Sequence, residues 1–211
     1  MNKIYLDKVA ILGTSKKFIT TIKSKYNYKL LKIFPWRRIK DNKIKKKIYF
    51  DYIFVCGFDF SLYYRNFNLF CNQNINEPLK FLKKISYKKT KIIYINTLSD
   101  QEKYTLSRYK YAKQNLAYYI QKNFKYSIII NTDLITIDNK ISVFSSAITK
   151  IIFRLLIIFG FLRAIEINNL IIIINKLMSK KNEKKQKKIY GLFLNLPRTQ
   201  FIDRILRFFF K

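Results

Sequence analysis

Apolar and polar positions divide the chain into short runs of β-branched and aromatic residues, separated by longer segments with spaced apolar residues. The short runs, which are typical of buried strands, are KVAILG (Lys8–Gly13), YKLLKIF (Tyr28–Phe34), FDYIFVCG (Phe50–Gly57), KIIYI (Lys91–Ile95) and YSIIINTDLI (Tyr126–Ile135). The longer segments, expected to be helices, include TSKKFITTIKSKY (Thr14–Tyr26), NINEPLKFLKK (Asn74–Lys84) and IEINNLIIIINKL (Ile165–Leu177). This alternation predicts an α/β domain with a parallel sheet and crossover helices.

The most informative stretch, Lys91–Leu134, reads as strand, loop, helix and strand. Its expected helix carries Tyr109 and Lys113, which share one face because they are four residues apart. Thr97 and Ser99 lie just beyond the preceding apolar run. A lysine ammonium lowers the pKa of a nearby tyrosine, and a hydroxyl can hold a substrate oxygen. Together these groups could do acid/base chemistry on a carbinol or carbonyl.

The spacing alone does not single out this pair, because the chain has 16 tyrosines and is rich in lysine. The same spacing occurs at Tyr28/Lys32, Tyr87/Lys91 and Tyr118/Lys122. Only the pair at Tyr109 follows a strand ending in N-T-L-S and precedes a further apolar strand. Its position between two predicted strands therefore singles out the Tyr109–Lys113 pair from the other three.

At this point the chain resembles the extended short-chain dehydrogenases, the branch that contains nucleotide-sugar epimerases and dehydratases. FDYIFVCGFD (Phe50–Asp59) is similar to that family's fourth strand, followed by a small-residue turn at Cys56–Gly57. Asn74 opens the next helix where the family has a structural asparagine. IEINNLIIIINKL and KKIYGLFLNLPRTQFIDRI are similar to the family's late helix, strand and final helix.

The resemblance implies a Rossmann-like parallel sheet with flanking helices over residues 1–140 and a small C-terminal lobe over residues 141–211. It also implies NAD(P)-linked chemistry on a nucleotide sugar or a similar hydroxyl substrate. Tyr109 would exchange a proton with the substrate, Lys113 would bind the nicotinamide ribose, and Thr97, or Ser99 in its place, would orient the substrate oxygen. Gly57 and Asn74 would line the cofactor site. The chain departs from the family in lacking a strand-helix unit between the second and fourth strands and an arginine and proline after Asn131–Thr132. The largest departure is in the glycine-rich turn.

The turn after the first strand is only partly suited to a dinucleotide. Gly13 fits the first position of a glycine-rich turn, but Lys16 and Ile19 stand at the second and third. Thr14 or Ser15 could cap the following helix, and Lys16 could offer its charge to a phosphate. A plain strand-turn-helix that binds nothing fits the same residues equally well.

Trp36-Arg37-Arg38 follows the second strand, where dinucleotide folds choose between cofactors. No acid is present for a ribose 2′-OH, whereas Arg37 and Arg38 could pair with a 2′-phosphate. If a dinucleotide binds, NADP is therefore favoured over NAD. The alternative is that these arginines begin a solvated basic loop, RRIKDNKIKKK (Arg37–Lys47).

The composition excludes several kinds of catalytic and metal-binding site. The chain has no histidine, which excludes Ser-His-Asp and Cys-His hydrolysis and histidine-ligated zinc. Cys56 and Cys71 are isolated and are expected in the core, so no residue is assigned to a metal. The formal net charge is +31, which favours a polyanionic partner. However, Lys, Asn, Ile, Tyr and Phe are enriched together, a set that AT-biased codons also produce.

Three segments bear on localisation and on the C-terminal part. The N-terminus has no signal-peptide pattern, so we expect the protein in the cytoplasm or in the organelle where it is made. Ile151–Ile165 is too short to span a membrane and is expected to be a buried helix, the alternative being a helix lying on an anionic membrane surface. Ser179–Ile189 is expected to be an exposed lysine-rich loop, and LPRTQFIDRILRFFFK a terminal helix capped by Thr199.

Three functions are consistent with the sequence. The first is an NAD(P)-dependent oxidoreductase or epimerase. The second is an inactive Rossmann-fold subunit of a larger assembly with protein partners, favoured by the altered glycine turn. The third is a basic ribosomal or RNA-binding protein, favoured by charge and by tyrosines interleaved with lysines, although no RNP, KH or zinc-knuckle signature is present.

Overall fold

A parallel sheet forms the centre of the computed structural model, which describes residues 4–13, 16–39, 48–62, 66–97, 108–132, 134–137, 140–141, 151, 155, 164–179 and 184–189. The sheet has six strands in the order β2-β1-β3-β4-β5-β9. Their bounds are β1 (Ile4–Leu12), β2 (Tyr26–Phe34), β3 (Tyr52–Val55), β4 (Lys91–Thr97), β5 (Ser127–Thr132) and β9 (Lys184–Ile189). Every pairing within it is parallel. The predicted α/β class and parallel sheet are confirmed.

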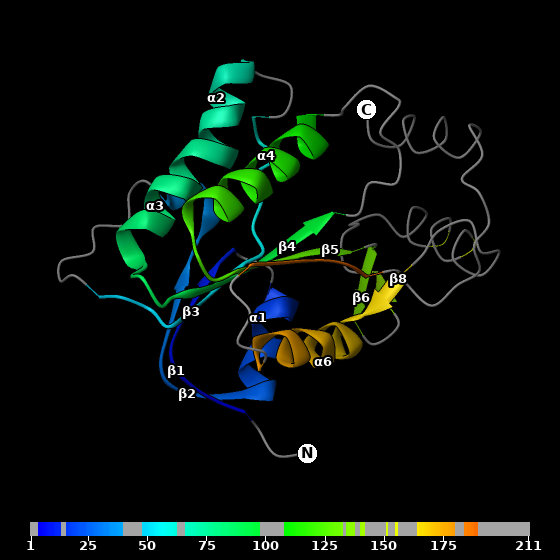
Figure 1. Ribbon diagram of the computed structural model, residues 1–211. Coiled ribbons are helices and arrows are strands. Elements are labelled where there is room, and N and C mark those ends of the chain that lie inside the picture. Colours follow the sequence, from blue (N-terminus) through cyan, green and yellow to red (C-terminus); the bar gives the residue numbers. More distant parts are fainter. Residues whose placement is uncertain are drawn as a thin grey trace.

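Helices cover both faces of this sheet (Figure 1). On one face lie α1 (Lys16–Lys25) and α6 (Ile167–Met178). The other face carries α2 (Phe67–Cys71), the π turn η2 (Asn72–Asn76), α3 (Glu77–Ile85) and α4 (Arg108–Asn123). A small second sheet has the order β7-β6-β8, formed by β6 (Leu134–Ile137), β7 (Lys140–Ile141) and β8 (Ala164–Glu166).

The core is split by the sheet into two layers. Along β3, Phe54 points into the layer under α1 and α6, whereas Ile53 and Val55 point into the layer under α3 and α4. Side chains of a strand alternate between the two faces of its sheet, and a strand covered on both faces is apolar throughout. This explains why the central strands read as continuous apolar runs.

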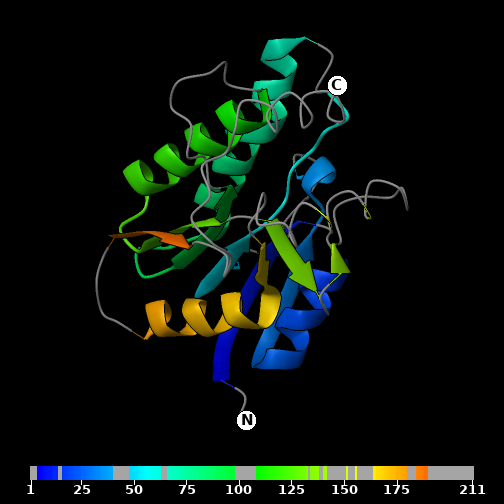
Figure 2. The ribbon, with the colours of Figure 1, turned by 90° about the vertical axis from the view of Figure 1, so that its right-hand side faces the viewer.

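One prediction about an element is wrong. The sequence predicts an exposed lysine-rich loop at Ser179–Ile189, but the second half of this segment forms β9, which pairs with β5 from Ser127↔Lys184 to Thr132↔Ile189. Figure 2 shows β9 at the edge of the sheet. Pairing with β5 needs only backbone N–H and C=O groups, so an edge strand can carry side chains that give no apolar signal.

Other predictions fall largely outside the described residues. These include the strand and terminal helix after residue 189 and the loop at 40–47. Of the expected buried helix at Ile151–Ile165, the helical residues Ile151 and Leu155 are described, and both are exposed. Between β2 and β3, the described residues contain one 3-10 turn, η1 (Trp36–Arg38), where the family has a strand-helix unit.

The predicted division at residue 140 stays a prediction. Although they follow that residue in the chain, α6 packs on the main sheet and β9 extends it. Within the part of the chain that is described, no helix is long and apolar enough to cross a membrane.

Candidate cofactor crevice and catalytic pair

The carboxyl ends of β1 and β3 mark the place where a Rossmann-like sheet binds its ligand. The chain passes from β1 to β2 on one side and then to β3 on the other, so the order reverses between β1 and β3. Dinucleotides bind in the crevice outside the carboxyl ends at such a switch point. The turns that follow these strands therefore decide whether a dinucleotide fits.

Gly13, directly after β1, is held against the turn that follows β3. Its φ is +144°, and a Cβ there would lie 2.9 Å from both Cys56 Sγ and Gly57 N. Its N–H donates to Phe34 O at 3.0 Å, and Cys56 N–H donates to Leu12 O at 3.0 Å. The glycine predicted for the first turn position is thus required by contacts within the chain itself.

Trp36 fills the space above Gly57. The indole is 2% exposed, and a Cβ on Gly57 would lie 2.2 Å from its Cε3 atom. The same Cβ would lie 3.0 Å from the Cα of Gly13. The ring therefore covers the junction of the turns after β1 and β3, which is the surface that a dinucleotide would approach.

Hydrogen bonds hold the indole in this place. Trp36 Nε1–H donates to Asn74 Oδ1 at 3.1 Å, and Gln73 Nε2 donates to Trp36 O at 3.2 Å. Asn74 Oδ1 also accepts from Asp59 N at 2.8 Å, while its Nδ2 donates to Asp59 O and Phe70 O. Both polar atoms of the buried Asn74 side chain are hydrogen-bonded within the chain. Its predicted part in cofactor binding therefore stays a prediction, and binding a cofactor would require breaking one of these bonds.

Arg37, predicted to pair with a 2′-phosphate, forms an ion pair with Asp59. Arg37 Nε lies 2.8 Å from Asp59 Oδ1, which also accepts from Ser61 N at 2.9 Å. Burial of Asp59 acts to raise its pKa, but the hydrogen bonds from Ser61 and the charge of Arg37 outweigh it and lower the pKa. Asp59 is therefore a carboxylate at neutral pH and neutralises the arginine.

These observations together test the fit of a dinucleotide, and the described residues do not fit one. Side chains of the protein occupy the space over Gly57 and use the hydrogen-bonding groups around it. A bulky residue near the second glycine position would also keep a backbone from a pyrophosphate, and that position holds Lys16. The side chains of Lys16 and Arg38, and residues Thr14 and Ser15, lie outside the described residues.

Lys113, on α4, points into the protein beside the end of β4. Its Nζ donates to Ile95 O at 2.7 Å and lies 4.6 Å from the centre of the Tyr94 ring. The residue is 6% exposed, and burial lowers its pKa to about 8, with Cys56 acting in the opposite direction. Among the described residues Ile95 O is the one hydrogen-bond acceptor for an ammonium that has three protons to donate.

Tyr109 lies one helical turn from Lys113, as predicted, among aromatic rings. Its ring centre is 4.6 Å from that of Phe58 and 5.3 Å from that of Phe60. Tyr94, which the sequence did not single out, joins this group: its hydroxyl donates to Lys113 O at 3.2 Å. Burial, and then the charge of Tyr109, raises the pKa of Tyr94 well above its ordinary value.

The structure brings some of the predicted site residues together and leaves others undescribed. Tyr109 and Lys113 share one helix face near the end of β4, whose last residue is Thr97. The side chain of Thr97 and the whole of Ser99 lie outside the described residues. The sequence missed the role of Trp36, whose signal was a lone tryptophan placed directly after the second strand and its proline.

Lys113→Met is expected to change how stability depends on pH. In the unfolded chain a lysine has a pKa of about 10.4. Between about pH 8 and 10, Lys113 is therefore protonated in the unfolded chain and largely neutral in the folded one. Because the unfolded chain then binds more protons, the stability of the wild type rises with pH over this range. At about pH 7 the variant should be more stable than the wild type, by up to about 3 kcal/mol, because no charge is buried. This advantage should shrink towards pH 10.

Urea denaturation of both chains across this range measures the effect. Lys122→Met is the matched control, since Lys122 is an exposed lysine of the same helix. A pH-independent difference between Lys113→Met and the wild type would contradict a buried ammonium.

Comparisons place this architecture among known folds. No protein-family model matches the chain, and no curated protein matches its sequence. Among solved structures, it is similar to dTDP-4-dehydrorhamnose reductase from Bacillus anthracis in complex with NADP, with a TM-score of 0.61 and 12% identity over 91% of this chain and 77% of that one. A mutant UDP-glucuronic acid 4-epimerase from Bacillus cereus, in complex with a UDP-sugar and NAD, gives a TM-score of 0.62 and 14% identity over 88% of this chain and 78% of that one.

A third similar structure is the ADP-L-glycero-D-manno-heptose-6-epimerase of Helicobacter pylori, with a TM-score of 0.58 and 12% identity over 87% of this chain and 77% of that one. Identities this low establish the fold alone. The chain therefore has the NAD-dependent epimerase/dehydratase-like fold, and the prediction drawn from the resemblance is confirmed at that level.

Proposed function

We propose that this chain, which has the fold of nucleotide-sugar enzymes but fills its own crevice, is a Rossmann-fold subunit that binds no dinucleotide. It would serve as a structural part of a larger assembly. The observation that carries this proposal is Trp36, buried on Gly57 and hydrogen-bonded to Asn74. A ligand entering the crevice would have to displace a packed indole and break the contacts around it.

Two further observations support a structural role. Arg37 pairs with Asp59, so a cofactor phosphate would have to compete with that carboxylate for the guanidinium. Lys113 donates to a backbone carbonyl of β4, which holds its ammonium inside the protein. The crevice is thus stabilised by the protein's own groups at both of these points.

A titration with NADPH tests the proposal. Trp36 is the sole tryptophan, so its fluorescence and that of the nicotinamide can both be followed. A chain of net charge +31 attracts any phosphate, and such binding weakens steeply with salt. We expect weak binding at about 0.05 M salt and none that saturates at about 0.5 M salt.

A second candidate is an NAD(P)-dependent oxidoreductase or epimerase acting on a nucleotide sugar, with NADP preferred. It is favoured by Tyr109 and Lys113, one turn apart beside the end of β4, and by the neighbours of the same fold. A bound nicotinamide dinucleotide would supply hydride transfer in such an enzyme. The phenol oxygen of Tyr109 would hold the exchangeable proton, and the charge of Lys113 would lower its pKa.

The same titration separates the two candidates. Saturable binding at about 0.5 M salt that is lost in Lys113→Ala but kept in Lys122→Ala would overturn the structural proposal and favour the enzyme. In that case Tyr109→Phe should abolish turnover of a nucleotide sugar while leaving NADPH binding intact.

A further inference from the structure

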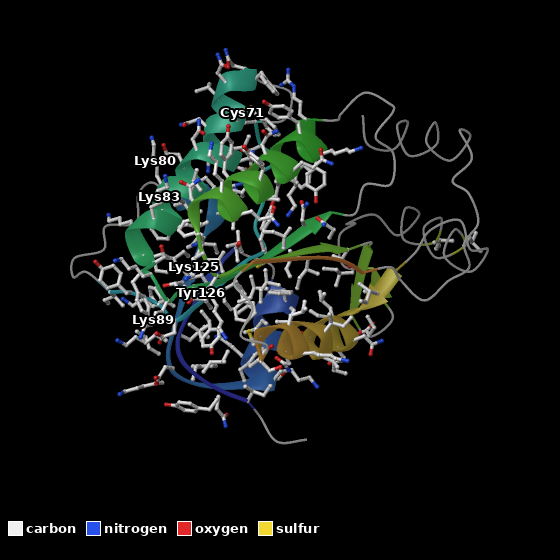
Figure 3. All side chains as sticks on the ribbon, in the orientation of Figure 1. Cys71, Lys80, Lys83, Lys89, Lys125 and Tyr126 are labelled. Carbon is white, nitrogen blue, oxygen red and sulfur yellow. The ribbon has the colours of Figure 1, made fainter. Side chains whose placement is uncertain are left out.

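Exposed lysines gather at the end of the sheet opposite the crevice, near the amino ends of β4 and β5. Lys83 and Lys84 lie in the last turn of α3, and Lys122 lies in the last turn of α4. Lys88 and Lys89 form the tip of the turn that leads into β4. All five are exposed, and together they are called the lysine face. Figure 3 shows Lys83, Lys89 and Lys125 along the same side of the molecule.

The turn that carries Lys88 and Lys89 is fixed to the body of the protein. Tyr87 N–H donates to Thr90 Oγ1 at 2.8 Å, and Thr90 N–H donates to Tyr87 O at 3.0 Å. Thr90 is 2% exposed, and its hydroxyl donates to Phe50 O at 2.6 Å. The two lysines therefore stand on a rigid support, and a ligand that binds them has no loop to order first.

No acid in the described part of the chain neutralises the lysine face. The ion pairs found there are Arg37–Asp59 and Lys80–Glu77, and neither includes a lysine of this face. Two described carboxylates act on Tyr87, which adjoins Lys88: its hydrogen bond to Asp51 and the charges of Asp51 and Asp7 all raise its pKa. Asp51 accepts hydrogen bonds from both Tyr87 Oη and Lys8 N. Close positive charges without counter-charges repel one another, and a polyanion would relieve that repulsion.

Exposed aromatic rings lie among these lysines. Tyr87 is 40% exposed and Tyr118 is 57% exposed, and Lys122 Nζ lies 6.0 Å from the centre of the Tyr118 ring. Aromatic rings beside a basic groove are the usual means of stacking unpaired bases. A lipid surface would be met by exposed aliphatic and phenylalanine side chains. None of the described ones belongs to α3, to α4 or to the turn between α3 and β4; they are Ile4, Ile33, Phe60, Phe67, Leu69, Ile151, Leu155 and Ile172.

We propose that the lysine face, with Tyr87 and Tyr118, binds single-stranded RNA. The phosphates would lie against the lysines, and bases would stack on the exposed tyrosines. This face is at the amino ends of the strands, whereas Trp36 and Gly57 are at the carboxyl ends. RNA binding is therefore independent of whether the crevice takes a dinucleotide.

Fluorescence anisotropy of the full chain with a labelled oligouridylate of about 20 nucleotides tests the proposal. The test variant replaces Lys83, Lys84, Lys88 and Lys89 by glutamine. A matched control removes the same number of charges at the same end of the strands but outside α3, α4 and the turn between α3 and β4. It replaces Lys23, Lys25, Lys29 and Lys176, which belong to α1, β2 and α6. We expect the test variant to lose affinity by about tenfold or more at about 0.1 M salt and the control by less than about threefold.

The salt dependence and the tyrosines provide further readouts. The slope of log K against log salt should be less steep in the test variant, by about 0.7 for each RNA phosphate that the variant no longer neutralises. Tyr118→Ala should weaken binding about tenfold without changing this slope, because stacking releases no counterions. Equal losses in the two lysine variants, or tighter binding to phosphatidylserine vesicles than to RNA with the same variant sensitivity, would overturn the proposal.

Discussion

Trp36→Ala is expected to lower the free energy of unfolding by about 3–5 kcal/mol, the usual cost of removing a large aromatic side chain from a core. The indole is 2% exposed and packs with Phe34, Phe50 and Phe81 in the layer under α3 and α4. Its loss would leave a cavity and would also remove the donor to Asn74 Oδ1. Urea denaturation of the full chain, followed by circular dichroism, measures the change.

Trp36→Phe is the control for this prediction. Phenylalanine keeps an aromatic ring over Gly57 but lacks the Nε1–H donor, so a smaller loss of about 1–3 kcal/mol is expected. A loss below about 1 kcal/mol in Trp36→Ala would show that the indole is not packed in the crevice. The central observation behind the proposed structural role would then fail.

Gly57→Ala is expected to have the second large effect, a loss of about 1–3 kcal/mol or more from overpacking. The added Cβ would lie 2.2 Å from Trp36 Cε3, closer than any real contact, so the ring would have to move. The ring cannot move freely, because its Nε1–H donates to Asn74 and the backbone oxygen of Trp36 accepts from Gln73. Urea denaturation again measures the loss.

A double-mutant cycle identifies the cause. If the Cβ clashes with the indole, Trp36→Ala should remove most of the cost of Gly57→Ala, and the two effects should fall short of additivity by about 1–3 kcal/mol. Additive effects would instead place the clash elsewhere, such as at the Cα of Gly13. Gly13→Ala is an informative comparison, because its φ of +144° makes a side chain strained whatever occupies the crevice.

The strands and helices could be predicted because their signals are local. The runs in β1, β3, β4 and β5 are apolar on both faces, and α6 repeats its buried residues with helical spacing. β9 could not be predicted, because it is held by backbone pairing with β5 and its sequence, KKQKKI, gives no apolar pattern. A propensity argument fails at a polar edge strand of this kind.

The candidate site was predictable only where its signal is local in the sequence. The Tyr109–Lys113 pair depends on spacing within one helix, and the structure places both residues as expected on α4. The crevice depends instead on contacts between residues far apart in the sequence, such as Trp36 with Asn74, 38 positions later. No local pattern shows that a tryptophan after the second strand will fold back onto a glycine after the third.

The hydrogen bond from Trp36 to Asn74 has a consequence for dynamics. It joins the connection after β2 to the π turn that leads into α3, and Asp59 joins the connection after β3 to the same asparagine. Opening the crevice would break several of these bonds together with a packed core layer, so it should occur only when the domain unfolds. The indole N–H should therefore exchange with solvent as slowly as the amides of the central strands, and the crevice wall should last as long as the folded state itself.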